Sequence, residues 1–235
     1  VIESSIARDA DLVLPIYCGQ EVGVASTKAF IGQMLVLYIL STKISFDQKC
    51  ISKKVYQDKI KNLLTLSNST KKTLKLDQKI LEIGKTFAGA KGSMFLGRGY
   101  SFPIALEGAL KLKELAYVHA EGYPAGEMKH GPLALIEEGM PVVVLAPRDE
   151  HYKKTISNMQ EVIARGAKVL LITNKNKDEV ISENIWEKIE VDKLDEELIP
   201  FLMTIPLQKL AFYSALEKGY DIDKPRNLAK SVTVE

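Results

Sequence analysis

The chain has 235 residues, of which 46% are hydrophobic and 26% are charged, and these ordinary proportions indicate a folded globular protein. Its formal net charge of +2 gives no general electrostatic attraction to nucleic acid or to anionic lipid. The two cysteines, Cys18 and Cys50, form no CxxC motif and no zinc-type cluster with the three histidines. We therefore predict reduced thiols, no metal site and a cytoplasmic protein.

The N-terminal part of the chain contains two apolar segments. Residues 11–17, DLVLPIY, are predicted to form a short buried strand. Ser26 or Thr27 is predicted to cap a long apolar helix that continues to about Ser41. The most apolar window of that helix, residues 31–40, is about half as long as the ~20 residues that a membrane span needs. We therefore predict a core helix and no membrane span.

Residues 51–90 have a different composition, rich in lysine with leucine and isoleucine at helical spacing. This pattern predicts two amphipathic helices, separated near residues 67–69, that join two parts of the protein. We interpret the lysines as a solvated helix face, because they alternate with the apolar positions of the same helices.

From residue 92 onwards, apolar strands alternate with helices. Continuous apolar strands that are separated by helices predict an α/β fold with a parallel sheet and helices on both faces. The predicted strands are SMFLG (93–97), PVVVLA (141–146), KVLLIT (168–173) and EKIEV (187–191), and the predicted helices cover about 103–118, 150–166 and 196–218.

One predicted helix carries three charged side chains on a single stripe. Glu107, Lys111 and Glu114 are separated by four and then three residues, which places them on the same helical face. Such a stripe is either a solvated ion-pair ladder or a carboxylate held ionised beside a cation in a pocket. A proton transfer next to a carbonyl needs a base of the second kind. Helical spacing alone leaves both interpretations open.

Residues 122–132 contain glycine or proline every few positions, so we predict a structured loop there. His130 stands directly before a Gly-Pro pair, so we predict that it lies on a loop and that its side chain is not packed in a core. A catalytic role for His130 is one hypothesis. The glycines after the strand at 93–97 resemble a phosphate-binding loop, but Phe102 interrupts the dinucleotide pattern. A nucleotide-binding module is therefore a weakly supported alternative.

Three stretches closely resemble one family. GVASTKAF, ALEGALKLKELAYVHAEGYPAGEMKHGPLALI and PRNLAKSVTVE resemble the isomerase part of the glutamine–fructose-6-phosphate aminotransferases, which is built from sugar isomerase (SIS) domains. The resemblance spans nearly the whole chain. It implies a doubly wound parallel sheet with flanking helices, a flavodoxin-like three-layer fold. It also implies the end of a first, truncated SIS domain at 1–50, a helical linker at 51–90, a second SIS domain at 91–218, and a tail at 219–235 that closes the active site.

The resemblance also implies a reaction without a cofactor. The family converts fructose 6-phosphate and glutamine-derived ammonia to glucosamine 6-phosphate, the first step of hexosamine biosynthesis. Lys230 matches the lysine that forms an imine with the ketone carbon, and Glu114 matches the glutamate that moves a proton between C1 and C2. Glu107 and Lys111 match residues that line the same site. His130 matches a histidine that assists ring opening and is supplied by the neighbouring subunit of a homodimer.

The resemblance places substrate contacts at Val24, Ser26 and Ala229. Because an amine attacks a carbonyl only when it is deprotonated, we expect Lys230 in a dry pocket beside the Lys111 cation, with the small residues of the tail packed around it. The glutaminase domain and the phosphate loop of the first SIS domain have no counterpart in these residues, so we expect weak activity or none from this chain alone.

Two other functions share this fold. A fructosamine-phosphate deglycase would use similar acid–base groups, but the PRNLAKSVTVE ending argues against it. A non-catalytic sugar-phosphate sensor would carry a basic DNA-binding segment in known regulators, and the small net charge does not indicate one.

Overall fold

Five parallel strands form a sheet at the centre of the molecule. The structure, a computed structural model, describes residues 4–175 and 184–231. The strand order is β2-β1-β3-β4-β5, and every neighbouring pair is parallel. Because the chain proceeds first to one side of β1 and then to the other, the sheet is doubly wound in the flavodoxin-like order, which confirms the predicted fold class. The strands are β1 (Gly92–Gly97), β2 (His119–Pro124), β3 (Pro141–Leu145), β4 (Lys168–Asn174) and β5 (Glu187–Val191).

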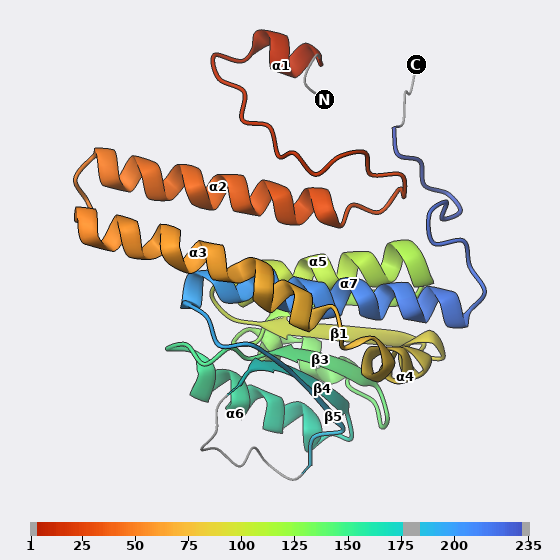
Figure 1. Cartoon of the computed structure of the whole chain (residues 1–235). Coiled ribbons are helices and arrows are strands. Elements are labelled where there is room, and N and C mark those ends of the chain that lie inside the picture. Colours follow the sequence, from red (N-terminus) through yellow and green to blue (C-terminus); the bar gives the residue numbers. More distant parts are fainter. Residues whose placement is uncertain (1–3, 176–183, 232–235) are drawn as a thin grey trace.

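Helices cover both faces of this sheet (Figure 1). The helices α4, α5 and α7 pack on one face, where they meet strand residues such as Phe95 and Val143. Helix α6 covers the other face, against the adjacent strand residues Met94 and Val142. Successive side chains of a strand point to opposite faces, so a strand that is apolar throughout contributes to both layers. The helices are α1 (Ser5–Asp9), α2 (Lys28–Asp47), α3 (Lys53–Thr73), α4 (Asp77–Ala88), α5 (Ser101–Ala116), α6 (Tyr152–Ile163) and α7 (Ile199–Glu217), with short 3-10 turns η1 (Met128–His130), η2 (Pro132–Leu135) and η3 (Glu196–Leu198).

The N-terminal part departs from the prediction. Residues 11–17 form irregular backbone instead of a buried strand, and Leu12 and Tyr17 are exposed. Helix α2 is longer than predicted. Among its described residues, only Thr42 is buried. The predicted core position is therefore wrong, because α2 forms an outer layer that packs on α3 and α7 and, at Gly32, against Ile16 of the irregular N-terminal segment (Figure 1). By length and composition, α2 and the helix at Glu196–Glu217 could each cross a membrane, but the second is mostly buried in the core.

Two further boundaries differ from the prediction. The predicted linker helices are present as α3 and α4, but they separate at residues 74–76 instead of 67–69. Ser69 lies inside α3, and its hydroxyl donates a hydrogen bond to Asp192 at 3.1 Å, so it serves a tertiary contact and not a break. The predicted loop at 122–132 begins as β2 and continues into η1. Strand β2 is an edge strand whose side chains are mostly half-buried, which explains why it lacks the apolar pattern of the other strands.

Helix α5 is held tightly against the sheet and α7. A Cβ atom at Gly108 would lie 2.8 Å from Leu207 of α7 and 3.1 Å from Phe95 of β1. The glycine therefore allows the helix backbone to approach both neighbours closely. As a result α5 is buried around much of its circumference, including positions that carry charge.

Candidate active site

The charged stripe of α5 is buried. Glu107 and Lys111 are 9% and 3% exposed, and Glu114 is 23% exposed. The Lys111 ammonium nitrogen lies 2.6 Å from Glu114 Oε2 and 3.6 Å from Glu107 Oε1. A buried charge without a partner is costly, so the ammonium and the two carboxylates stabilise one another. The interpretation as a solvated ladder is therefore wrong, and a cation beside carboxylates at a partly enclosed site is the arrangement observed.

The two carboxylates of this stripe have different surroundings. Burial raises the pKa of Glu107, and the Lys111 ammonium offsets only part of that rise. Glu107 Oε1 has no hydrogen-bond partner within the described ranges. Glu114 instead accepts a direct hydrogen bond from Lys111 and is more exposed. Of the two, Glu114 has both a close cation and access for a substrate, as a general base requires.

A second cluster is built on the loop before α2. Glu21 Oε1 accepts hydrogen bonds from the backbone N–H groups of Thr27 at 2.8 Å and Ala29 at 3.2 Å, which lie at the start of the helix. Glu21 thus caps α2, whereas Thr27 occupies the N-cap position without a capping bond from its own side chain. Burial alone would raise the pKa of Glu21, but these backbone bonds and the Lys230 ammonium lower it to about 2.

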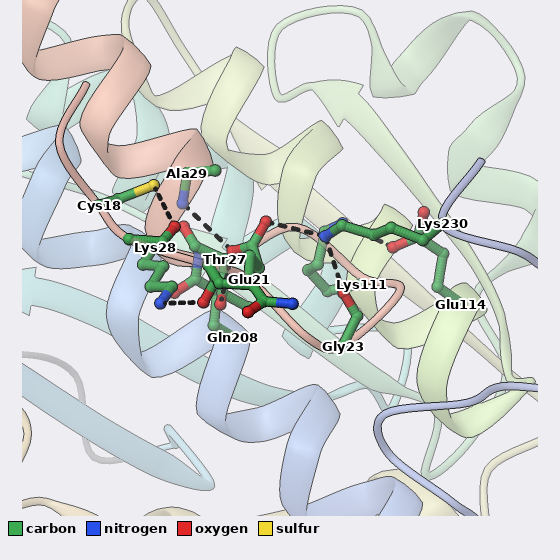
Figure 2. Close-up of polar contacts among 12 residues, drawn as sticks. Cys18, Glu21, Gly23, Thr27, Lys28, Ala29, Lys111, Glu114, Gln208 and Lys230 are labelled. Carbon is green, nitrogen blue, oxygen red and sulfur yellow. Dashed lines mark hydrogen bonds and ion pairs between the residues drawn. The ribbon is translucent and has the colours of Figure 1, made fainter. Parts of the chain in front are cut away.

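The C-terminal tail brings Lys230 to the same loop. The Lys230 ammonium lies 3.1 Å from Glu21 Oε2 and donates a hydrogen bond to the Gly23 carbonyl oxygen at 2.8 Å (Figure 2). The Val24 N–H donates to the Asp223 carbonyl oxygen at 3.0 Å, which joins the loop to the tail at a second point. The end of the described chain is therefore docked on the molecule, as the sequence led us to expect.

The surroundings of Lys230 differ from the expectation in one respect. Its side chain is 44% exposed and pairs with the Glu21 carboxylate, whereas we expected a dry pocket beside the Lys111 cation. In this arrangement the Lys230 nitrogen is engaged with a carboxylate and a carbonyl oxygen, so it is not free to attack a carbonyl carbon. Of the small residues that were expected to pack around the amine, Val232 and Thr233 lie outside the described residues.

The two clusters meet at the C-terminal end of α5. Leu115 of α5 and Glu21 line the same cavity of about 680 Å³. The hydroxyl of Tyr117, the residue that follows α5, accepts a hydrogen bond at 2.6 Å from the backbone N–H of Arg226 in the tail. Figure 2 draws both clusters in one view. The end of α5, the loop before α2 and the tail therefore lie next to one another, although Lys111, Glu114 and Lys230 do not themselves line this cavity.

His130 stands apart from both clusters. It ends η1, its side chain is 78% exposed, and its Nε2 lies 3.8 Å from the carboxylate of Glu127. Within residues 4–175 and 184–231, no hydrogen bond or ion pair joins His130 to Lys111, Glu114 or Lys230. The prediction that this segment presents the histidine outside the core is confirmed, and the single chain does not bring it to the site.

The three predicted substrate-binding positions flank the second cluster. Val24 and Ser26 are half-buried in the loop that carries Glu21, and Ala229 is exposed beside Lys230. The Val24 amide is already bonded to the tail, so a backbone contact from this residue to a substrate would use its carbonyl oxygen.

Comparison with known proteins gives the family. The model of the SIS domain matches residues 86–218. The chain belongs to the SIS domain family. The match contains the sheet and α5 with its charged stripe, whereas the loop of Glu21 and the tail of Lys230 lie outside the matched part of this SIS chain.

Several relatives are similar along the whole SIS chain. A glutamine–fructose-6-phosphate aminotransferase (isomerizing) of Bacteroides thetaiotaomicron is 50% identical over 234 residues, which is 100% of this chain and 38% of the relative. A protein of the same name from Bartonella quintana is 46% identical over 235 residues, or 39% of its own length. The solved C-terminal domain of glucosamine-fructose-6-phosphate aminotransferase from Francisella tularensis has a TM-score of 0.92 and 42% identity over 96% of this chain and 64% of that one. The chain thus spans 38–39% of the length of these curated relatives.

Glu21 is the residue of this site that sequence reasoning missed. Its partner Lys230 is 209 positions away, so no local pattern connects the two. A signal was nevertheless present, because an acidic residue shortly before a helix favours the N-terminal end of that helix.

Proposed function

We propose that this SIS chain is the isomerase part of a glutamine–fructose-6-phosphate aminotransferase, which converts fructose 6-phosphate and glutamine-derived ammonia to glucosamine 6-phosphate. The observation that carries the proposal is the docking of the Lys230 amine on the loop next to the Lys111–Glu114 end of α5. A ketose-to-aldose rearrangement through an imine needs an amine nucleophile and a nearby carboxylate base. The names of the relatives support the same substrate.

In the proposed reaction, Lys230 Nζ attacks the C2 carbonyl of the open-chain sugar, and loss of water leaves a C=N bond. Ammonia then replaces the lysine at C2 and frees its amine. Glu114 removes a proton from C1 and returns one to C2, and the C1 hydroxyl gives up its proton while the nitrogen gains one, so C1 becomes the aldehyde carbon and C2 carries the amine. The rearrangement is internally redox-balanced, because C1 is oxidised while C2 is reduced. The Lys111 ammonium orients Glu114 through their 2.6 Å hydrogen bond, with Glu107 as its second counter-ion.

The pairing of Lys230 with Glu21 corresponds in this proposal to a resting arrangement. Before attack, the lysine has to leave the Glu21 carboxylate and lose a proton. Its two contacts are to the surface of a loop and its side chain is partly exposed, so this movement requires no change in the sheet or in α5.

We further propose how this chain fits into the full-length protein. Residues 1–50 form the end of a first SIS domain, 51–90 link it to a second at 91–218, and 219–235 form the tail that closes the site. The length of the relatives supports further domains, including a glutaminase domain. The exposed apolar side chains on the outer side of α2, such as Leu37 at 63%, support a missing layer that packs there.

A homodimer completes the proposal. The exposed His130 would assist ring opening in the site of the neighbouring subunit, which fits its lack of contact with the site of its own chain. The partners are thus a sugar phosphate and a second copy of the protein, in the cytoplasm.

Imine trapping tests the proposed function. The full-length protein is incubated with fructose 6-phosphate and borohydride, and the peptide of Lys230 is examined for a reduced sugar adduct. We expect an adduct in the wild type and none in Lys230→Arg; a wild type without an adduct favours a non-catalytic sensor.

Two further assays test other parts of the proposal. The Glu114→Gln variant should still form the adduct but lose exchange of the C1 proton with solvent. Glutamine-dependent formation of glucosamine 6-phosphate separates the proposed enzyme from a deglycase.

A further inference from the structure

The tail that carries Lys230 is also held by a cation that lies over a pair of aromatic rings. The Arg226 guanidinium lies 4.4 Å from the ring centre of Tyr117 and 5.9 Å from that of Tyr220. The two rings pack against each other with centres 4.7 Å apart. In addition, the Arg226 backbone N–H donates its 2.6 Å hydrogen bond to the Tyr117 hydroxyl. Four contacts thus join three residues, which we call the tail clamp.

The tail clamp connects the two elements that carry the proposed chemistry. Tyr117 is three residues after Glu114 and ends α5 in a left-handed conformation with φ of 52°. A non-glycine residue in that conformation is uncommon, and here it turns the chain at the end of the helix. Arg226 is four residues before Lys230. The clamp is therefore close in sequence to both the base and the amine.

This position limits where the amine can go. Beyond α7 the described tail contains no helix or strand, so individual contacts hold it, among them the Val24–Asp223 backbone hydrogen bond and the contacts of Arg226. Four residues of extended chain reach about 14 Å at most, at ~3.3–3.6 Å per residue. With Arg226 fixed at the end of α5, Lys230 can leave Glu21 for a substrate and still stay within reach of Glu114. With Arg226 released, the nearest anchor before Lys230 is the Val24–Asp223 backbone hydrogen bond, so seven residues instead of four separate the amine from its anchor and it can occupy a larger volume.

We propose that Tyr117, Tyr220 and Arg226 are positioning residues that keep the Lys230 amine near the Glu114 carboxylate during turnover. This inference rests on the proposed function, since it assigns a task within that reaction. The three side chains touch the chain that carries the amine and not the sugar itself. Their loss should therefore reduce the rate of imine formation and leave the affinity for the sugar phosphate nearly unchanged.

Three variants of the full-length protein separate the parts of the tail clamp. Arg226→Ala removes the cation, Arg226→Lys keeps a charge, and Tyr117→Phe removes only the hydroxyl that accepts the backbone hydrogen bond. Lys218→Ala is the matched control, because Lys218 also lies over the Tyr220 ring, at 5.5 Å, but directly follows α7 and does not hold the tail. Arg226 is exposed, so its replacement should not prevent folding.

The first measurement is the rate of borohydride trapping on Lys230, together with kcat and the KM for fructose 6-phosphate. We expect Arg226→Ala to lower the trapping rate and kcat about ten-fold or more, with KM within about two-fold, because misplacing a reacting group costs rate rather than binding. Arg226→Lys and Tyr117→Phe should be intermediate, and Lys218→Ala should match the wild type. A wild-type trapping rate in Arg226→Ala overturns the inference.

The second measurement does not depend on the reaction. Proteolytic cleavage within residues 219–231 of the full-length protein should be faster in Arg226→Ala than in Lys218→Ala, because the tail is released. If the wild type forms no adduct, the proposed function is wrong, and so is the proposed role of the tail clamp in catalysis. Faster cleavage would then still assign the clamp as the anchor of the tail, whereas unchanged cleavage rejects that as well.

Discussion

At the residue scale, the two carboxylate oxygens of Glu21 serve two different parts of the chain. Oε1 accepts from backbone N–H groups at the start of α2, and Oε2 accepts from the Lys230 ammonium. The helix N-terminus and the lysine both favour the ionised carboxylate, so each contact supports the other. The same side chain thereby fixes the beginning of a helix and gives the tail its charged docking point.

Replacing Glu21 by glutamine tests this double role through the pH dependence of stability. The carboxyl has a pKa of about 2 in the folded protein against an ordinary value of 4.5, so its stabilisation is complete above about pH 5 and is lost as the pH falls from about 4.5 to about 2. We expect Glu21→Gln to lower the free energy of unfolding by about 1.5–3 kcal/mol at pH 7. Urea denaturation between pH 3 and pH 7 should show the difference shrinking toward low pH. Glu150→Gln, at a 79% exposed carboxylate, is the control and should differ little from the wild type throughout.

Among the charged residues of the site, we expect removal of the Lys111 charge to lower the free energy of unfolding most. Its removal leaves Glu107 and Glu114 facing each other in a buried place without a cation. Breaking a buried ion pair on one side costs about 3–5 kcal/mol, so we expect Lys111→Met to destabilise the protein by that amount in chemical denaturation. Lys113→Met, at an exposed position of the same helix, should stay within about 0.5 kcal/mol of the wild type. A loss below about 1 kcal/mol for Lys111→Met would mean that the carboxylates find other partners.

At the element scale, the alternation of apolar strands and helices after residue 92 predicted a parallel sheet with helices on both faces, and four of its five strands. The pattern works there because strands buried on both faces are apolar at most positions. It failed for residues 11–17 and for α2, where apolar sequence implied burial that the described part of the chain does not provide. It also missed β2, because an edge strand with half-buried side chains lacks that signature. Apolar sequence therefore predicted whether a segment forms a helix or a strand more reliably than whether that segment is buried.

The turn from β1 into α5 sets the position of the charged stripe. A Cβ atom at Gly97 would press on the Ser101 carbonyl group and lie 2.8 Å from the Phe102 nitrogen. These are backbone atoms that cannot move aside without shifting the start of α5. The spacing of the site therefore depends on a glycine that is not itself one of the proposed catalytic residues.

Gly97→Ala tests how the turn supports the site. We expect a loss of about 1–3 kcal/mol in the free energy of unfolding, because overpacking has to displace the helix. Gly92→Ala, at the start of the same strand, meets no atom closer than 3.5 Å and should have a much smaller effect. Thermal or urea denaturation of both variants gives the comparison. Equal stabilities would show that the turn can relax without cost.

At the scale of the whole molecule, the site joins segments from both ends of the chain. The loop before α2 and the tail are about 200 residues apart in sequence, and the sheet and helix α5 lie between them. Family resemblance could predict which residues belong to the site, but the Glu21–Lys230 pair and the tail clamp arise from tertiary contacts with no local signature. In the proposed dimer, one residue of the site comes from a second chain.

Mixing two inactive variants of the full-length protein tests that dimer. One variant carries His130→Ala and the other Lys230→Ala, and each alone should have little activity. If His130 acts across the interface, a mixed dimer contains one site with the intact lysine of one chain and the intact histidine of the other. Random pairing then restores about a quarter of the wild-type sites, because half of the dimers are mixed and each has one working site. If His130 acts within its own chain, no combination has both groups in one site, and the mixture stays as inactive as its components.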